Sequence, residues 1–152
     1  MNESASTTAE GTIEGARRSD LAQIRWLLNA VSLPSTDITE YSLEHFLVYR
    51  DAIGVAGVVG LERHGDVALL RSLVVADGYL SRGLGRRLVR CAEELARELG
   101  IRRIYLLTTT AELYFESLGF RYVKRESAPP AIEQSAQFKS LCPSTAVLMM
   151  KP

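Results

Sequence analysis

The stretch "VVADGYLSRGLGRRLVRCAEELARELG", Val74–Gly100, decides the fold. It places Gly83 and Gly85 one residue apart, follows them with an Arg pair, and continues as a long run of helix formers that ends at Gly100. Glycine costs a helix about 1 kcal/mol per position, so two glycines at a helix start need a reason. We infer that a ligand comes very close to the backbone there.

The start of this predicted helix, which runs from about Gly83 to Leu99, has the properties of an anion site. A helix N-terminus leaves backbone N–H groups without partners and carries a partial positive charge. Arg82, Arg86 and Arg87 add cationic side chains nearby. We therefore expect a pyrophosphate at this position.

Two common phosphate motifs do not fit the stretch. A Walker A loop needs Gly-Lys-Ser/Thr, which is absent. The dinucleotide fingerprint needs a third glycine, but position 88 is Leu, and it belongs to an all-parallel βαβ unit, whereas the strand here ends a predicted antiparallel meander. On these residues alone, an ordinary tight turn into a helix stays open as an alternative.

Hydrophobic periodicity and turn signals along the whole chain predict a mixed α/β domain without repeats. A short strand comes first, followed by a helix that Ser19 or Asp20 caps and Pro34 ends. The further expected elements are a short helix within 38–46, strands at 46–50, 53–63 and 66–75, the long helix, a strand at 102–110, a short helix at 111–119, a strand at 120–126, a short helix within 129–141 and a last strand at 145–151. The apolar stripe of the first helix consists of Leu21, Ile24, Leu27, Leu28 and Val31.

Length and composition predict one cytoplasmic domain over residues 12–152 behind a disordered polar tail, residues 1–11. The 18 basic and 18 acidic residues cancel, which argues against a nucleic-acid partner. Cys91 and Cys142 make no disulfide framework. The polar N-terminus has no apolar core of a signal sequence, and no apolar run in the chain has the length of a membrane span, so we expect no membrane partner.

The loop Leu80-Ser81-Arg82-Gly83-Leu84-Gly85 resembles the acetyl-CoA loop, Gln/Arg-x-x-Gly-x-Gly/Ala, of the Gcn5-related N-acetyltransferases, the GNAT family. Leu80 departs from the Gln/Arg of that pattern, but the loop acts mainly through backbone amides. "YFESLGF", Tyr114–Phe120, resembles the second family marker, Phe-Tyr-x-x-x-Gly-Phe. The resemblance covers roughly residues 12–152 and implies a GNAT-like fold, in which helices flank a central mixed, mostly antiparallel sheet of about seven strands.

The resemblance implies acetyl-CoA as the acetyl donor and no metal. It places the pantetheine arm along the backbone of Leu73, Val74 and Val75, where an N–H holds the thioester oxygen. The remaining cofactor-binding residues that it implies are Leu80, Ser81, Arg82, Gly83, Leu84, Gly85, Arg86, Arg87 and Phe115.

The catalytic acid departs from the family pattern, because the usual Tyr falls on Phe115 here. Either water helps the thiolate to leave or Tyr114 does so from about 100° around the helix; the alternative is that Tyr114 is a core aromatic. Glu44, in the early helical segment that would wall the pocket, is a base candidate. The other base candidates are Glu40, His45, Glu62 and Glu112.

The acceptor site is expected around Arg71, which lies in an apolar strand. A guanidinium clamps a carboxylate or arsonate well; the alternative is an outward-facing residue that pairs with Glu62. Thr108 and Thr109 end the next strand and are substrate-binding candidates. Residues 128–141 would form a lid, from which Gln137 and Phe138 contact substrate.

Two further segments, "IYLLTTTAELYFESLGF" and "SAPPAIEQSAQFKSLCPSTAVLMMK", resemble the bacterial arsenic-resistance N-acetyltransferases of the second type. They imply a small-molecule amine as acceptor, such as an amino-acid-like organoarsenical. A non-catalytic acyl-CoA sensor and a protein or peptide N-acetyltransferase remain alternatives. The sequence does not decide whether two chains form a homodimer. One cysteine is a poor arsenic site, so we expect no role for Cys142.

Overall fold

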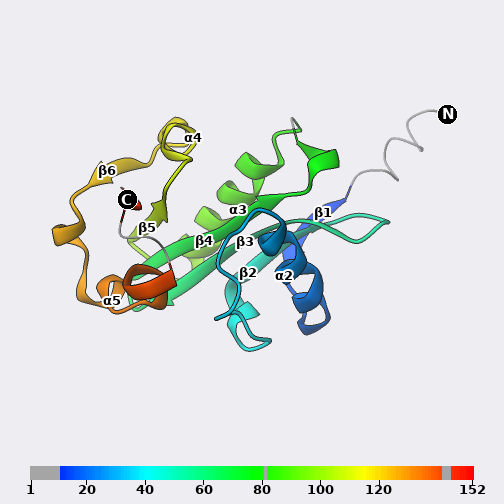
Figure 1. Ribbon diagram of the computed structural model, residues 1–152, viewed down its shortest axis with the longest axis horizontal. Coiled ribbons are helices and arrows are strands. Elements are labelled where there is room, and N and C mark those ends of the chain that lie inside the picture. Colours follow the sequence, from blue (N-terminus) through cyan, green and yellow to red (C-terminus); the bar gives the residue numbers. More distant parts are fainter. Residues whose placement is uncertain (1–10, 81, 142–144) are drawn as a thin grey trace. The chain divides into compact units, whose positions relative to one another are not determined.

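The computed structural model describes residues 11–80, 82–141 and 145–152, so the tail predicted for residues 1–11 falls outside it except for Gly11. The strands are β1 Thr12–Gly15, β2 Phe46–Arg50, β3 Val55–His64, β4 Val67–Val75, β5 Arg103–Thr108, β6 Arg121–Val123 and β7 Val147–Lys151 (Figure 1). The α-helices are α2 Leu21–Ala30, α3 Leu84–Glu98, α4 Glu112–Ser117 and α5 Pro130–Glu133. Short 3₁₀ turns are η1 Arg18–Asp20, η2 Ser42–His45, η3 Asp77–Tyr79 and η4 Arg125–Ser127, and η5 Gln137–Leu141 is a π-helix.

The strands form one seven-stranded sheet in the order β1-β2-β3-β4-β5-β7-β6. The pairs β1–β2, β2–β3, β5–β7 and β6–β7 are antiparallel, whereas β4 and β5 are parallel. Parallel neighbours need a crossover connection, and α3 supplies it. The predicted mixed α/β fold with a mostly antiparallel sheet flanked by helices is confirmed.

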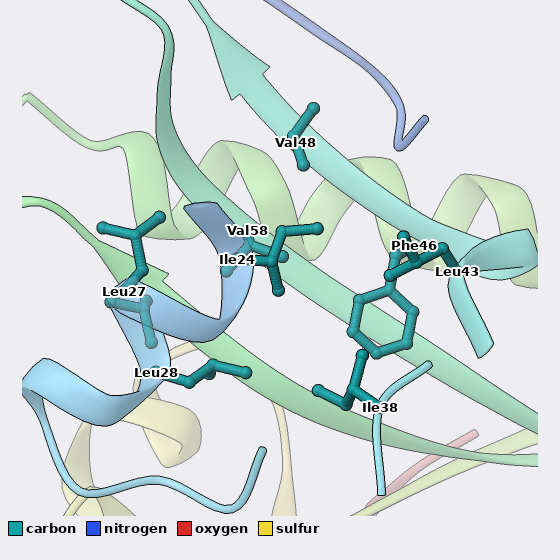
Figure 2. Close-up of a cluster of buried hydrophobic side chains, with 9 residues drawn as sticks. Ile24, Leu27, Leu28, Ile38, Leu43, Phe46, Val48 and Val58 are labelled. Atoms are coloured by element: carbon teal, nitrogen blue, oxygen red, sulfur yellow. The ribbon is translucent and has the colours of Figure 1, made fainter. Parts of the chain in front are cut away.

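The chain divides into two compact units, and the first holds the residues up to Gly60 together with Ser72–Ala92. Its core lies between α2 and the strands β2 and β3, as Figure 2 shows. The spacing of apolar residues along α2 explains this packing, because Ile24, Leu27 and Leu28 share one face of the helix and are buried. The other members of this core are Ile38, Leu43, Phe46, Val48, Val58 and Val74.

Helix α2 ends in a Schellman motif. Ser32 adopts a left-handed φ of 60°, its N–H donates to the carbonyl of Asn29 at 3.1 Å, and the N–H of Leu33 donates to the carbonyl of Leu28 at 2.9 Å. Val31 is therefore the last residue before the turn and is exposed. Its predicted place in the apolar stripe is wrong, because the helix stops before Val31 can face the core.

The second unit holds Leu61–Arg71 and the chain from Glu93 onward. Its core joins one face of β4, β5 and β7 to α5, through Val67, Leu69, Tyr105, Ile132, Leu148 and Met150. Lys151 donates to Glu93 at 2.9 Å and to the carbonyl of Leu118 at 2.8 Å, which fixes the last strand. The single domain predicted for residues 12–152 stays a prediction.

Candidate functional site

Gly83 opens α3 in a left-handed conformation, with a φ of 71°. Its carbonyl accepts the N–H of Arg87 at 3.1 Å, so the N–H groups of the first helical turn lack acceptors within the helix. A Cβ built on Gly83 would meet no atom within 4 Å. Leu84 is buried and fixes the helix start, and Gly85 follows in the first turn, half-buried. The backbone at Gly83 therefore has open space beside it, and the anion site expected there stays a prediction.

Three exposed arginines, Arg82, Arg86 and Arg87, surround this helix start. The guanidinium of Arg82 lies 4.7 Å from the centroid of the Tyr79 ring. That of Arg87 lies 5.9 Å from the centroid of the Tyr49 ring. Both contacts are cation–π interactions, so two of the three charges rest on aromatic rings. Leu80 is exposed, and Ser81 lies outside the described residues.

Asp51 connects the β2–β3 turn to the loop before α3. The Tyr79 hydroxyl donates a short hydrogen bond to Asp51, and the same carboxylate accepts the N–H groups of Ile53 at 2.9 Å and Gly54 at 3.3 Å. The hydrogen bond from Tyr79 holds the pKa of Asp51 below its usual value, and the charge of Arg82 adds to this effect. In return, the bond to Asp51 raises the pKa of Tyr79.

Strand β4 is irregular where the pantetheine arm is expected. Ser72 has a φ of 61°, a left-handed value inside a strand, which only a locally distorted strand tolerates. Leu73 and Val75 follow half-buried, and Val74 packs into the core. The register between β4 and β5 runs from Val67↔Arg103 to Leu69↔Tyr105, which is before the distortion.

Arg71 directly precedes this distortion, and its side chain is 3% exposed. Its Nη1 lies 3.0 Å from Oε2 of Glu62, and Oε1 of Glu62 lies 2.9 Å from Nε2 of His64. The predicted partner Glu62 is confirmed, but the outward-facing alternative for Arg71 is wrong. Alternation along β4 puts Arg71 on the face that carries Val67 and Leu69, which is the face that packs against α5.

The two aromatic residues of α4 differ in exposure, although the ring centroids of Tyr114 and Phe115 lie 5.4 Å apart in an edge-to-face contact. Phe115 is buried, with its ring centroid 5.8 Å from that of Phe120. Tyr114 is 40% exposed, so the alternative of a core aromatic is wrong. The hydroxyl of Thr108 accepts the N–H of Ala111 at 3.0 Å, which is a turn contact before α4.

The predicted lid consists of α5 and the π-helix η5. Gln137 is buried, and Phe138 lies under Arg125, whose guanidinium is 4.4 Å from the ring centroid. Arg125 also donates to the carbonyl of Ala146 at 2.8 Å. Arg125 therefore contacts both η5 and the segment before β7.

The remaining candidates are dispersed. Glu44 is 80% exposed and lies 3.9 Å from Nε2 of His45, and Thr109 is exposed. Cys91 is half-buried on α3, and Cys142 lies outside the described residues. Within residues 11–80, 82–141 and 145–152, no three His, Cys, Asp or Glu side chains are grouped to hold a metal ion. None of the helices in these same ranges has the length and apolar character needed to cross a membrane.

The model of the acetyltransferase (GNAT) family matches residues 16–120. The chain belongs to the GNAT family. Two curated relatives are the uncharacterized N-acetyltransferases CT2212 of Chlorobaculum tepidum, 32% identical over 66 residues, and YjgM of Escherichia coli, 34% identical over 74 residues. The matches cover 43% and 46% of this chain and only 42% and 43% of those relatives.

The fold of this GNAT chain also recurs in the N-acetylglutamate synthase from Neisseria gonorrhoeae, solved in complex with coenzyme A and N-acetyl-glutamate. The TM-score is 0.82 at 19% identity, over 93% of this chain and 34% of that one. At this identity, the likeness shows the fold alone.

Tyr49 and Asp51 lie close to the start of α3 but carry no signal in the sequence that would place them there. Tyr49 looks like an ordinary strand residue, and Asp51 looks like a turn residue, a role that it does fulfil. Their positions depend on pairing between β2 and β3, which brings the turn toward Tyr79. No local pattern encodes that contact.

Proposed function

We propose that this chain is an N-acetyltransferase that transfers the acetyl group of acetyl-CoA to the amine of a small molecule. The start of α3 carries this proposal, because the open backbone at Gly83 and the flanking Arg82 and Arg87 suit a diphosphate. Membership of the GNAT family supports it. A synthase of the same fold is complexed with coenzyme A.

In the proposed reaction, the neutral amine nitrogen attacks the thioester carbonyl. A C–N bond forms and the C–S bond breaks; the amine proton passes to a base or to water, and the CoA thiolate takes up a proton. Backbone N–H groups along Leu73–Val75 would polarise the carbonyl. The left-handed Ser72 supports this role, because a distortion just before Leu73 takes that backbone out of a regular strand.

The acceptor in this proposal carries an acidic group. Arg71 supports it, since a buried guanidinium already held by Glu62 is oriented for a planar oxyanion. The N-acetyl-glutamate in the Neisseria synthase is a ligand of this kind. The two C-terminal segments that resemble arsenic-resistance enzymes support an amino-acid-like organoarsenical. Thr109, Gln137 and Phe138 remain substrate-binding candidates.

Tyr114 is the proposed acid and Glu44 the proposed base. The partial exposure of Tyr114 supports its role, because this side chain is 40% exposed and carries a hydroxyl that can donate a proton, whereas the buried Phe115 ring has none. The Glu44 side chain is 80% exposed and contacts only His45, at 3.9 Å, among the ion pairs of the described residues, so its geometry supports the role of base less than that of Tyr114 supports the role of acid. A cytoplasmic location and a homodimer are further proposals.

A thiol-release assay tests the function. Purified protein is mixed with acetyl-CoA and a panel of glutamate, its phosphinate and arsinate analogues, neutral amino acids and peptides. We expect turnover with the acidic amino acids, and a KM for the acceptor raised at least tenfold by Arg71→Lys, about the effect of losing a bidentate pair. Arg121→Lys, an exposed residue on β6, is the matched control. Better turnover of peptides than of amino acids would contradict the substrate class.

A non-catalytic acyl-CoA sensor is the second candidate. The burial of Phe115 at the position of the usual acid favours it. Calorimetry separates the two functions, because a sensor binds acetyl-CoA tightly while no amine in the panel releases thiol. Steady turnover with any amine would exclude the sensor.

A further inference from the structure

Two tyrosine rings lie under two of the arginines at the start of α3. The ring centroids of Tyr49 and Tyr79 are 6.0 Å apart and the rings meet at 65°, an edge-to-face contact. Each ring supports one guanidinium, Tyr79 that of Arg82 and Tyr49 that of Arg87. We propose that the Tyr49–Tyr79 pair, locked by Asp51, is a positioning device that holds Arg82 and Arg87 ready for the phosphates of CoA. This inference rests on the proposed function.

A cation–π contact suits an arginine that must still bind a phosphate. The charge is held over the ring face by electrostatic attraction, and the contact does not use the guanidinium N–H groups as donors to an oxygen. The donors of Arg82 and Arg87 therefore stay available to an anion while the side chains are restrained. A restrained side chain loses less conformational entropy when the ligand binds.

The two rings are fixed in different ways. Tyr49 is buried, and its hydroxyl accepts the N–H of Gly11 at 2.7 Å. Tyr79 lies in the surface turn η3, and its hydroxyl bond to Asp51 ties it to the β2–β3 turn. Asp51 itself is held by two backbone N–H groups. Asp51 is thus the residue on which the exposed half of the device depends.

The test uses the full chain and two ligands, acetyl-CoA and the CoA fragment 3′-phospho-ADP, which has the phosphates but no pantetheine. We expect Tyr79→Leu to raise the Kd of both ligands by about tenfold, since it removes the surface that supports Arg82 and the bond to Asp51. The kcat at saturating acetyl-CoA should not change. Tyr41→Leu is the matched control, because Tyr41 is an exposed tyrosine that carries Arg18 at 5.5 Å, away from the α3 start.

Two variants test the hydrogen bond between Tyr79 and Asp51. Tyr79→Phe keeps the aromatic ring, and Asp51→Asn keeps the side-chain oxygen that accepts the N–H groups of the β2–β3 turn. We expect each to raise both Kd values by about threefold, and the double variant to do no more, because both remove the hydrogen bond from the Tyr79 hydroxyl to a charged carboxylate. Thermal unfolding checks that each variant is folded.

Three outcomes would overturn these expectations. An unchanged Kd in Tyr79→Leu, with the wild type binding acetyl-CoA, refutes the device alone. A loss confined to acetyl-CoA, with 3′-phospho-ADP unaffected, also refutes it, because the effect would then lie in the pantetheine arm. A wild type that binds neither ligand refutes the proposed function and with it the device.

Discussion

Two glycines of this chain share one backbone conformation and serve different purposes. Gly83 has a φ of 71° and Gly65 a φ of 69°, and a Cβ on either would meet no atom within 4 Å. Valine in a left-handed conformation costs roughly 1–2 kcal/mol at both positions. Only Gly83 lies at the start of α3. We therefore expect Gly83→Val to weaken acetyl-CoA binding at least tenfold.

Gly65→Val is the matched control for that prediction, since Gly65 lies in the β3–β4 turn. Calorimetric titration with CoA and thermal unfolding are compared for both variants. The two should lose similar stability, and Gly65→Val should bind CoA as the wild type does. Equal CoA affinity in both variants would remove the start of α3 from the ligand site.

Tyr114 gives the second prediction for a single residue. We expect Tyr114→Phe to lower kcat by about 100-fold, the lower end of the range for general acid catalysis, with little change in the KM of either substrate. The folded state should be nearly unaffected, because the hydroxyl is removed from a side chain that is 40% exposed. The check is a pH–rate profile, in which the variant should lose the descending limb at high pH.

Phe115→Tyr is the counterpart of Tyr114→Phe. The added hydroxyl enters the packing between Phe115 and Phe120, which costs about 1–3 kcal/mol if it finds no partner. We expect acetyl-CoA binding to stay unchanged. A large gain in kcat would show instead that the acid missing at this position limits the reaction and that Tyr114 does not replace it.

For Arg71 and Asp51, the sequence predicted part of the local environment but not all of their contacts. Arg71 stands out in an apolar strand, and its partner Glu62 was foreseeable from strand alternation. The apolar strand also indicated that Arg71 is buried, but it did not indicate that α5, which is distant in sequence, packs on the same face of the sheet. Asp51 was foreseeable as a turn residue, but not as the partner of Tyr79.

Among the elements, α2 shows a limit of boundary prediction. Pro34 was expected to end this helix, but the helix stops at Ala30 and the left-handed Ser32 completes the turn. Serine gives no clear sequence signal for this conformation, which glycine usually takes. The hydrogen bonds that this turn makes to the last carbonyls of α2 offset the conformational strain of the left-handed Ser32.

That cost leads to a prediction for the stability of α2. We expect Ser32→Gly to stabilise the protein by about 1 kcal/mol, the penalty of a left-handed conformation that glycine avoids, reduced by the entropy of the unfolded glycine. Ser32→Ala is the control and should change little, because alanine has the same penalty. Urea unfolding measures both. A loss of stability in Ser32→Gly would show that the serine side chain itself supports the turn.

For the whole molecule, the order of strands shows which strand pairings a local sequence pattern can predict and which it cannot. The parallel pair β4–β5 follows from a strand–helix–strand pattern that the sequence displays. The insertion of β7 between β5 and β6 does not, because that pairing joins residues far apart in the chain. The resemblance to the GNAT family implied the sheet, whereas periodicity alone predicted only its strands.

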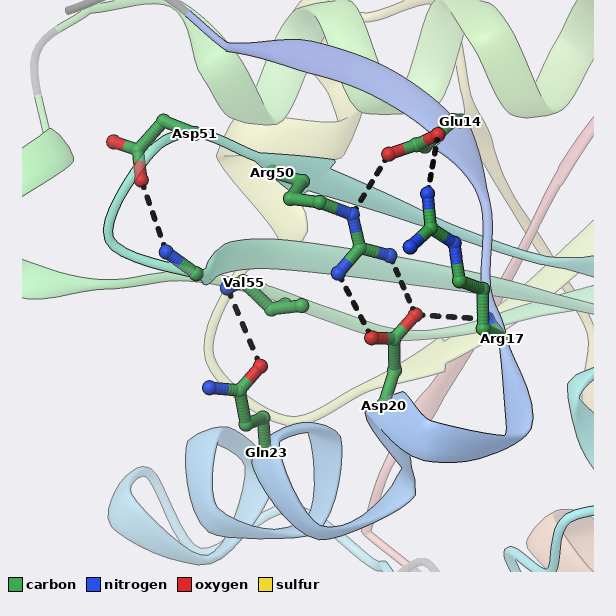
Figure 3. Close-up of polar contacts among 8 residues, drawn as sticks. Glu14, Arg17, Asp20, Gln23, Arg50, Asp51 and Val55 are labelled. Atoms are coloured by element: carbon green, nitrogen blue, oxygen red, sulfur yellow. Dashed lines mark hydrogen bonds and ion pairs between the residues drawn. The ribbon is translucent and has the colours of Figure 1, made fainter.

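An ionic network in the first unit ties β1, the start of α2 and β2 together (Figure 3). Arg50 donates to both carboxylate oxygens of buried Asp20, at 2.9 and 2.7 Å, and to Glu14 at 2.7 Å. Burial alone would raise the pKa of Asp20, but the hydrogen bonds from Arg50 and from the N–H of Arg17 outweigh it, and the pKa is lowered. The hydrogen bond from Arg50 also lowers the pKa of Glu14.

The pH dependence of stability follows from these directions. A carboxyl with a lowered folded pKa stabilises the protein above its unfolded pKa, about 4 for Asp and Glu. That contribution is lost as the pH falls through the folded pKa. We therefore expect the free energy of unfolding to fall below about pH 4, with Asp20, Glu14 and Asp51 contributing to the loss.

Arg50→Met isolates the network. At pH 7 it leaves the charge of Asp20 buried without its partner, and we expect a loss of about 3 kcal/mol. As the pH falls toward 4, Asp20 takes up a proton in the variant, because burial now dominates its pKa, so the gap to the wild type should narrow. Arg17→Met is the control, since Arg17 is 61% exposed and pairs with Glu14 only at 3.5 Å; its effect should be small and sensitive to salt. Denaturant titrations at both pH values decide the matter, because a gap that stays constant would mean that Arg50 stabilises the fold through packing and not through the charge of Asp20.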